Sequence, residues 1–356
     1  MGLLRVLLAL AVVITHNGNT FLGSNPILAV PAFFIISGFV IALVLNEKYL
    51  GNVSGFYFAR FLRLWPSYAV VLAVVLLFFS SIRAIPDSPV ANLHLYATSL
   101  SLLFFDTLGW FGFNQDLNII VMMDGTKNGA PHSIVWRTPM AHMWSVGVEL
   151  TFYMIAPLLA RRWKAIAIVL IIAFVVHVVI ILNIPSHHPV RTKSTFNSFY
   201  LFLAGMLSYW AWRHFQGLLG HFYIPPTLLA IGVGTITLWA GQPLALMHPL
   251  LPDFLLLLFA LLIIPLFHYS RQQWFDRQVG ELSYGVYLTH WPILNYLLSG
   301  HFGDWRWTTA IAGGSIISAV GLQLVVVRPL ESIRRSYGRT PLVSINPALG
   351  PVAEKA

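Results

Sequence analysis

The sequence predicts an all-α fold, a polytopic membrane helix bundle with about ten transmembrane helices. Of the 356 residues, 57% are hydrophobic and only 9% are charged, whereas soluble domains carry about 25% charged residues. The chain also contains apolar windows of roughly the 20 residues that a bilayer crossing requires. This composition excludes a large soluble domain. The absence of cysteine excludes disulfides, thiolate metal sites and a cysteine acyl-enzyme.

Ten windows have the length and composition of membrane spans, or come close to them. The segment 92–110 is ambiguous, because its polar residues Asn92, His94 and Asp106 favour a short interfacial or re-entrant helix. The predicted spans are 3–20, 27–45, 62–81, 142–160, 163–182, 196–212, 223–240, 250–268, 279–299 and 307–327.

The distribution of basic residues orients these spans. With a cytoplasmic N-terminus and 92–110 left out of the count, fifteen Lys and Arg residues fall on the cytoplasmic side and six on the outer side. Both termini are then cytoplasmic, residues 1–335 form one membrane domain, and residues 336–356 form a short cytoplasmic tail. The formal charge of +9 is spread over short loops, so we interpret it as a topology signal and expect membrane lipids, but no nucleic acid, as partners.

The first apolar helix contains two costly polar residues, Arg5 and His16. Their separation of eleven residues is three turns plus about 20°, so they share one helical face about 16 Å apart along the axis. A central Arg costs roughly 2.5–3.5 kcal/mol in a membrane helix. His16 is a candidate general base, because a neutral imidazole is the form that a base requires. A hydrogen-bonded structural histidine is the alternative.

Arg60 and Arg63 form a pair at i and i+3 at the cytoplasmic mouth of the third predicted span. Two guanidinium groups on one helical face can hold a phosphate through paired hydrogen bonds. Anchoring to lipid headgroups is an equally weighted alternative, because basic residues are common at membrane edges.

A polar stripe runs along the helix predicted over 142–160. Ser145, Glu149 and Tyr153 repeat at i, i+4 and i+8 on one face of an otherwise apolar helix. An intramembrane carboxylate such as Glu149 marks a functional site by default. Glu149 either orients an imidazole or pairs with a buried cation, and a purely structural ion pair is the alternative.

A second stripe lies on the helix predicted over 279–299. Ser283, Tyr287 and His290 share one face at i, i+4 and i+7, and Pro292 is expected to kink the helix just beyond them. His290 therefore competes with His16 as the base.

Two further features have more ordinary interpretations. Ser37 and Gly38 form a small pair in the middle of a helix, which favours close helix packing over a void for a ligand. The long outer loop 82–141 contains the aromatic residues of Trp110–Phe113 and Trp136. These side chains either form a platform for a sugar ring or lie at the level of the headgroups, and the second interpretation is favoured.

Taken together, these stretches resemble the acyltransferase 3 family of bacterial integral membrane acyltransferases over residues 1 to about 335. The matching stretches, in the family's order, are Arg5 with His16, Phe33–Phe39, Arg60–Tyr68, Trp144–Tyr153 and Ser283–Pro292. Three departures stand out: Met1–Leu4 replace an acidic-Gly-Leu lead-in, Leu150 replaces a second glutamate, and Val327 replaces the glutamate of a Glu-Arg-Pro end. The first departure is compatible with a native start upstream of Met1.

The resemblance implies an O-acyltransferase of the bacterial cytoplasmic (inner) membrane. Members move an acyl group, usually acetyl, from cytoplasmic acyl-CoA to a hydroxyl of a cell-surface carbohydrate, a lipid-linked glycan or a similar acceptor. The expected donor is thus acyl-CoA, in the usual case acetyl-CoA, and no metal is expected. The implied donor-binding residues are Arg5, Arg60 and Arg63, and the candidate catalytic residues are His16, Glu149, Tyr287 and His290.

A proton-coupled transporter or flippase is the main alternative, because buried His, Glu and Arg side chains can line a proton path. Against it, no repeat relates the two halves of the chain, and the arginine pair lies at a cytoplasmic mouth rather than midway. A non-catalytic membrane scaffold would leave the many intramembrane polar groups without a purpose.

Overall fold

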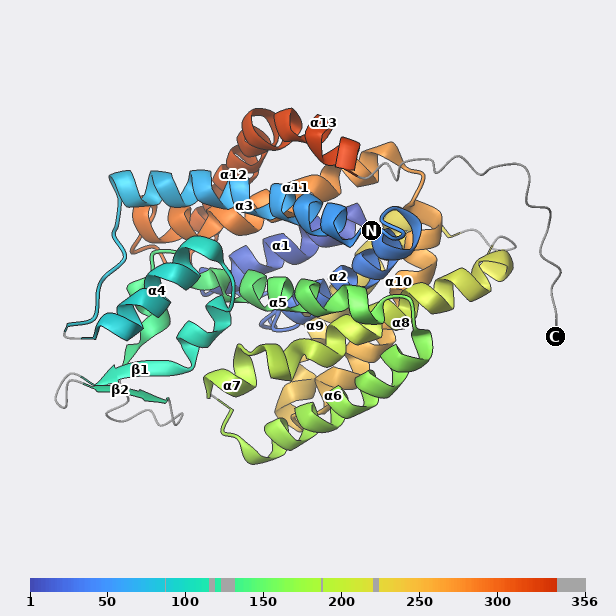
Figure 1. Cartoon of the computed structure of the whole chain (residues 1–356), viewed down its shortest axis with the longest axis horizontal. Coiled ribbons are helices and arrows are strands. Elements are labelled where there is room, and N and C mark those ends of the chain that lie inside the picture. Colours follow the sequence, from blue (N-terminus) through green and yellow to red (C-terminus); the bar gives the residue numbers. More distant parts are fainter. Residues whose placement is uncertain (87, 115–118, 123–131, 187, 220–223, 338–356) are drawn as a thin grey trace.

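The computed structural model describes residues 1–337 apart from 87, 115–118, 123–131, 187 and 220–223. Long helices run along the longest axis of the molecule, and α4, β1 and β2 gather at one end of it (Figure 1). The long helices are α1 (Gly2–His16), α2 (Ala29–Glu47), α3 (Val53–Phe78), α5 (Trp144–Leu159), α6 (Trp163–Asn183), α8 (Thr195–Leu219), α9 (Pro226–Met247), α10 (Leu251–Ser270), α11 (Trp274–Pro292) and α12 (Trp305–Leu322).

Each of the ten predicted windows coincides with one of these helices. Within the described part of the chain, six helices are long and apolar enough to cross a membrane, and Gly2–His16 is a shorter apolar helix. The protein is therefore all-α with several membrane-spanning helices. Ten crossings and two cytoplasmic termini stay predictions, and the proposed tail lies outside the described residues from 338 onward.

The ambiguous segment 92–110 begins within α4 (Pro89–Ser101), whose 13 residues make it too short to cross a bilayer. A 3₁₀ turn, Phe105–Gly109, follows it. The small antiparallel sheet beyond this turn was not predicted from the sequence. In that sheet, β1 (Phe111–Asn114) lies between β2 (Ile119–Met122) and β3 (His132–Ser133).

The first helix ends earlier than the predicted span 3–20. Gly18 adopts a φ of +75°, and the buried Asn17 side chain donates a hydrogen bond to Thr308 Oγ1 at 2.6 Å. The Asn17 carbonyl accepts a further bond from the Gly303 amide at 2.7 Å. These contacts tie the chain to the start of α12, so His16 is the last residue of α1 rather than a residue near mid-span.

Helices α1 and α11 run side by side in the same direction. At their starts, the amides of Gly2 and Leu3 donate to the Asp276 carboxylate at 2.8 and 2.9 Å, which satisfies donors that a helix leaves free. A Cβ on Gly2 would lie 1.6 Å from the Asp276 carbonyl oxygen, so only glycine permits this approach. At the other ends of the two helices, His16 meets His290. The parallel packing therefore brings the two histidines together.

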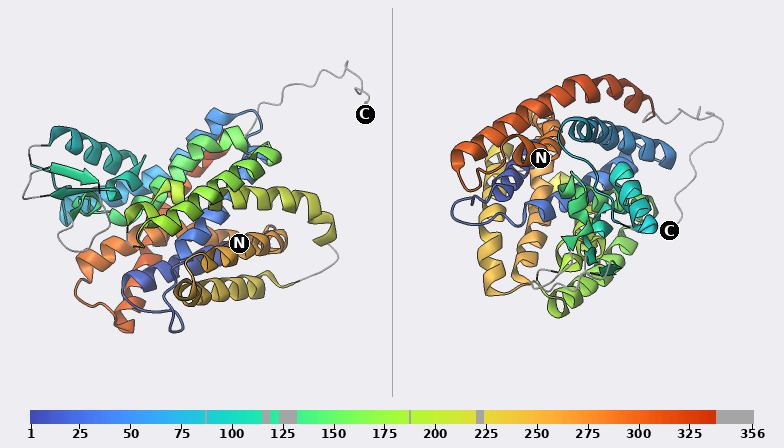
Figure 2. Two further views of the ribbon diagram at one scale, coloured as in Figure 1. Left: turned by 90° about the horizontal axis from the view of Figure 1, so that it is seen from below. Right: turned by 90° about the vertical axis from the view of Figure 1, so that its left-hand side faces the viewer.

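Glycines also set the contact between α2 and α8, which lie side by side in the bundle (Figure 2). A Cβ on Gly38 would lie 2.0 Å from the Phe202 carbonyl oxygen, and one on Gly205 would lie 1.9 Å from that of Ile35. The two helix backbones touch at these points, as the small pair Ser37-Gly38 predicts. This contact fixes the position of α2, whose other face borders the cavity described below.

Gly38→Ala should therefore destabilise the fold, because the added methyl group overlaps the α8 backbone. We expect a loss of about 1–3 kcal/mol, the usual cost of overpacking, measured as a lower melting temperature of the purified protein. Gly232→Ala in α9 is the matched control, since nothing lies within 4 Å of the position that its added methyl group would take. Equal melting temperatures for the two variants would contradict the packing argument.

Candidate functional site

A cavity lies between helices α1, α2, α3, α5 and α11. The cavity collects most of the polar residues that the sequence pattern singled out, although they lie far apart in the chain. Its polar lining residues are Arg5, Ser37, Arg60, Arg63, Ser145, Glu149, Tyr153, Ser283, Tyr284 and Tyr287. The predicted donor-binding residues and two of the four predicted catalytic residues thus share one cavity.

Three arginines make the lining of this cavity strongly cationic. Arg60 is buried, and its guanidinium lies over the rings of Phe56 and Tyr153 at 5.6 and 5.7 Å. Arg5 and Arg63 are half-buried on neighbouring helices. Among the described residues, none of the three guanidinium groups makes a hydrogen bond or ion pair with the protein. Their donors are therefore available to an anionic ligand, and guanidinium geometry suits phosphate.

Glu149 faces the same cavity but does not reach either histidine. One oxygen of its carboxylate, Oε1, accepts hydrogen bonds from Ser37 Oγ at 2.5 Å and from the Tyr153 hydroxyl. Two roles were predicted for Glu149, orienting an imidazole or pairing with a buried cation. No imidazole among the described residues hydrogen-bonds to its carboxylate. No ion pair to a described cation within 4 Å is formed either. Glu149 is the carboxylate that faces three cations in this cavity.

The two candidate bases form a pair. His16 Nδ1 lies 2.8 Å from His290 Nε2, and the two rings are nearly coplanar with an interplanar angle of 8°. His290 is fully buried, whereas His16 keeps part of its surface accessible. The sequence makes the two histidines alternative candidates for the general base, whereas in the structure they contact each other.

The hydrogen bonds assign a separate role to each imidazole. His290 Nδ1 contacts the Tyr287 carbonyl, which can only accept, so this nitrogen must carry the proton. In neutral His290, Nε2 then accepts, and His16 Nδ1 donates to it. His16 is left with an unprotonated Nε2. His16 is therefore the member of the pair with a nitrogen free to accept a proton, and His290 fixes its orientation.

Tyr287 connects the histidine pair with the cavity. Its hydroxyl donates to the His142 carbonyl at 2.6 Å and accepts from Ser145 Oγ, also at 2.6 Å. The Tyr287 hydroxyl proton is thus engaged, while its backbone carbonyl holds His290. Neither His16 nor His290 lines the cavity itself, but Tyr287 does, and its ring centroid lies 5.5 Å from that of His290.

Two aromatic neighbours of the pair were not identified from the sequence. Trp291 meets His16 edge-on at 5.2 Å between ring centroids, and His142 stacks on Trp291 at 5.5 Å. The ring centroid of His142 also lies 5.1 Å from that of His290. His142 precedes α5 in a 3₁₀ turn, Ala141–Met143, so helical periodicity gave no signal for it. Trp291 follows His290 directly in the stretch Ser283–Pro292 that carries the family resemblance, but the sequence gave it no role of its own.

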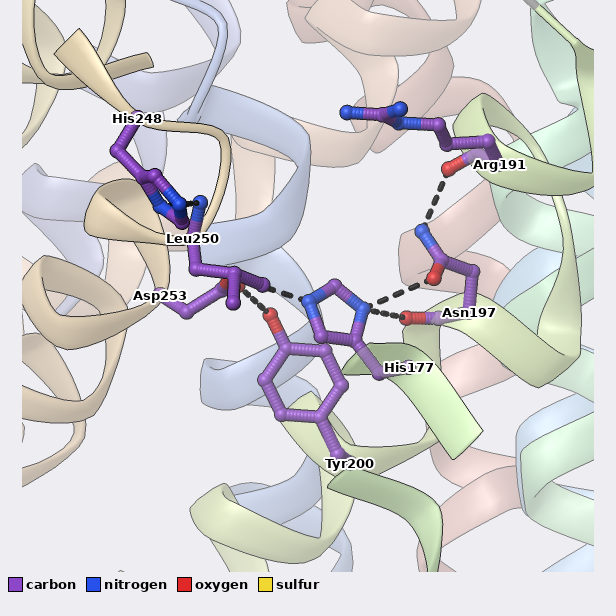
Figure 3. Close-up of polar contacts among 7 residues, drawn as sticks. All are labelled: His177, Arg191, Asn197, Tyr200, His248, Leu250 and Asp253. Atoms are coloured by element: carbon purple, nitrogen blue, oxygen red, sulfur yellow. Dashed lines mark hydrogen bonds and ion pairs between the residues drawn. The ribbon is translucent and has the colours of Figure 1, made fainter. Parts of the chain in front are cut away.

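A second buried polar cluster lies away from the cavity, between α6, α8 and α10 (Figure 3). His177 Nε2 lies 3.0 Å from Asp253 Oδ2, and its Nδ1 lies 2.8 Å from Asn197 Oδ1. The Tyr200 hydroxyl donates to the other carboxylate oxygen of Asp253. Asn197 presents its oxygen to His177 because its amide nitrogen donates to the Arg191 carbonyl. His177, an isolated residue in the sequence, is thus a buried link between three helices.

A family model described as an acyltransferase domain matches residues 1–327. Nodulation protein 10 of Rhizobium leguminosarum bv. viciae is 25% identical over 330 residues, which are 86% of this chain and 83% of that protein. Peptidoglycan O-acetyltransferase OatA of Listeria monocytogenes is 26% identical over 154 residues, 42% of this chain but only 22% of OatA. No solved structure matches the chain.

The fold and the site define a multi-pass membrane protein with a buried histidine pair beside a cationic cavity. The chain belongs to the acyltransferase 3 family of membrane acyltransferases. Among the described residues, no group of three or more His, Asp or Glu side chains is arranged to hold a metal ion.

The cluster around His177 should support the fold rather than the chemistry. Asp253→Asn removes the negative charge of a buried pair and replaces one of its two acceptor oxygens by an amide donor, which typically costs about 3–5 kcal/mol, so the melting temperature should fall. The activity of protein that remains folded at low temperature should persist, because the cluster borders neither histidine of the pair. Loss of turnover without a change in melting temperature would overturn this assignment.

Proposed function

We propose that the protein is an O-acyltransferase that moves an acyl group, most simply acetyl, from cytoplasmic acyl-CoA to a hydroxyl of a cell-surface carbohydrate or lipid-linked glycan. The observation that supports it best is the His16–His290 pair next to a cavity whose three guanidinium groups form no hydrogen bond or ion pair with the described residues. The relative OatA is named as a peptidoglycan O-acetyltransferase, which agrees with this class of reaction. The cell location that fits is the bacterial cytoplasmic membrane.

The donor proposal rests on charge and shape. The phosphates of coenzyme A would bind Arg60 and Arg63, with Arg5 on the neighbouring helix adding a third cation. Three guanidinium groups and a single carboxylate line this cavity, so its charge favours a donor with several negative charges. The slim pantetheine arm would then extend past Ser145 and Tyr287 toward His16.

In the proposed reaction, His16 Nε2 takes the proton of the acceptor hydroxyl while its oxygen attacks the thioester carbonyl. A new C–O bond forms, the C–S bond breaks, and the imidazolium returns the proton to the coenzyme A thiolate. During this step His16 Nδ1 keeps donating to His290 Nε2, while His290 Nδ1 keeps its own proton and donates it to the Tyr287 carbonyl. Direct transfer needs no covalent acyl-enzyme.

His16→Ala should abolish transfer, because general base catalysis contributes about 10²–10⁴-fold. The measurement is release of free coenzyme A from acetyl-CoA by the purified, detergent-solubilised protein. His290→Gln should lower kcat while leaving the KM for acetyl-CoA unchanged, since His290 only orients the base. His214→Ala on exposed α8 surface is the control. Full activity of His16→Ala, or acyl-independent flux across vesicles, would favour a transporter instead.

Arg60→Ala should weaken acetyl-CoA binding by about 10- to 150-fold, the equivalent of 1.5–3 kcal/mol for a hydrogen bond to a charged group. Arg60→Lys should restore binding only in part, because an ammonium cannot replace the planar guanidinium fork. Calorimetric titration with coenzyme A measures both. Arg161→Ala, an exposed arginine outside the cavity, should bind like the wild type. Unchanged affinity in Arg60→Ala would contradict the donor site.

A further inference from the structure

The cavity lined by the three arginines, the arginine cavity, is elongated along α2 and α5. These two helices run in the same direction, because Ser37 donates to Glu149 in their first halves and Asn46 Nδ2 donates to the Ala160 carbonyl at their ends. The lining residues that α2 contributes lie within 30–41, which is about 16 Å of helix. The contacts along α2 and α5 therefore distinguish two ends of the cavity.

One end of the cavity carries the cations. The Arg60 guanidinium lies 5.7 Å from the ring centroid of Tyr153, which is the last lining residue along α5. Arg63 is also close enough to Tyr153 to interact with it electrostatically. Arg5 precedes His16 by eleven residues on α1, so it too lies away from the histidine pair.

The other end borders the histidine pair. Ser145, the first lining residue along α5, lies 2.6 Å from the Tyr287 hydroxyl. The Tyr287 ring centroid lies 5.5 Å from that of His290. In the proposed reaction the thioester must reach His16, so the acyl group of the donor would lie at this end. We call it the acyl end.

The acyl end has an apolar wall. Val30 and Phe33 line it from the first turns of α2, and Val146 lines it from the first turn of α5. Val30 is the first residue of α2 in the lining, so the cavity ends at this level. Phe33 also packs against a hydrophobic cluster that contains Val13, three residues before His16. These side chains leave an acyl chain little room to extend beyond the thioester.

The acyl end offers no partner for a charged acyl group. The ionisable side chain nearest to Ser145 along α5 is Glu149, one turn away, and its charge is negative. The hydroxyl protons at this end are engaged, since Ser145 donates to Tyr287 and Tyr287 donates to the His142 carbonyl. A carboxylate on the acyl group would be buried there without a donor, which is costly.

We propose that the acyl end selects a short, uncharged acyl group, and that Val30 and Phe33 set the upper limit of its length. The assignment rests on the proposed acyltransferase function and specifies the donor of that reaction. An acetyl group fits against the apolar wall. A succinyl group brings an unpaired negative charge toward Glu149, and a hexanoyl group overlaps the ring of Phe33.

Turnover of a series of thioesters tests the proposal. The purified, detergent-solubilised protein is given acetyl-CoA, hexanoyl-CoA or succinyl-CoA, and the release of free coenzyme A is measured. For the wild type, kcat/KM for acetyl-CoA should exceed that for each of the other two at least about tenfold. Phe33→Ala should raise kcat/KM for hexanoyl-CoA relative to acetyl-CoA at least about tenfold, because it removes the ring that blocks the longer chain. Phe33→Leu should give a smaller change. Neither variant should improve the turnover of succinyl-CoA, since neither adds a cation.

A matched control lies on the same helix. Leu43→Ala shortens a partly buried side chain of α2 outside the cavity lining, so its preference among the three thioesters should match that of the wild type. Calorimetric titration with free coenzyme A, which has no acyl group, should give the same affinity for Phe33→Ala as for the wild type, because the arginines are untouched. This second measurement separates a change in selectivity from a damaged fold.

Three results would overturn the acyl end: equal turnover of succinyl-CoA and acetyl-CoA, equal turnover of hexanoyl-CoA and acetyl-CoA by the wild type, or an unchanged preference in Phe33→Ala with intact coenzyme A affinity. Acetyl-CoA turnover that depends on His16 and Arg60 would uphold the proposed function even in those cases. Absence of turnover with every thioester would overturn the proposed function and the acyl end with it.

Discussion

The hydrogen bond from His290 to the Tyr287 carbonyl is the constraint on which the site depends. Because a carbonyl only accepts, this bond fixes the tautomer of His290, and His290 in turn fixes that of His16. The pair is built without a described carboxylate next to it. In a bundle interior this has a physical advantage, since a buried carboxylate would need its own compensating partners. Backbone polarity orients the base without adding a buried charge.

The packing of α1 against α11 brings His16 and His290 together. Glycine at position 2 lets α1 start against the first turn of α11, and the two helices then run in parallel for the length that separates Gly2 from His16. Asn17 and Thr308 end α1 at the histidine. Beyond Pro292, α11 continues as a π-helical turn, Ile293–Leu297, a distortion that is common at functional sites. Each of these features acts at one end of the contact between α1 and α11, and together they keep His16 next to His290.

Sequence reasoning could predict the helices and the residue types of the site, but only part of its geometry. The apolar windows match the observed helices because hydropathy is a local property of the chain. Arg5 was identified because a cation in an apolar helix is costly, and Arg60 and Arg63 because their spacing of three residues places two guanidinium groups on one helical face. The partnership of His16 with His290 depends on a contact across 274 residues, and no local pattern contains it. Glu149 was expected to orient an imidazole or to pair with a buried cation, and its carboxylate accepts hydrogen bonds from Ser37 and Tyr153 instead. The three-stranded sheet and His142 were missed because short strands and turns carry little periodic signal.

The position of the histidine pair bears on how the proposed reaction crosses a membrane. If the donor binds in the arginine cavity and the acceptor reaches His16 from the other side of the pair, neither substrate has to cross. Only the acyl group, a few atoms long, passes between them at His16. An enzyme of this kind needs no alternating access, which agrees with the absence of a sequence repeat between its halves. Its buried polar groups would then serve a fixed site, and the close glycine contacts that hold α1 against α11 and α2 against α8 suit a rigid bundle better than a rocking one.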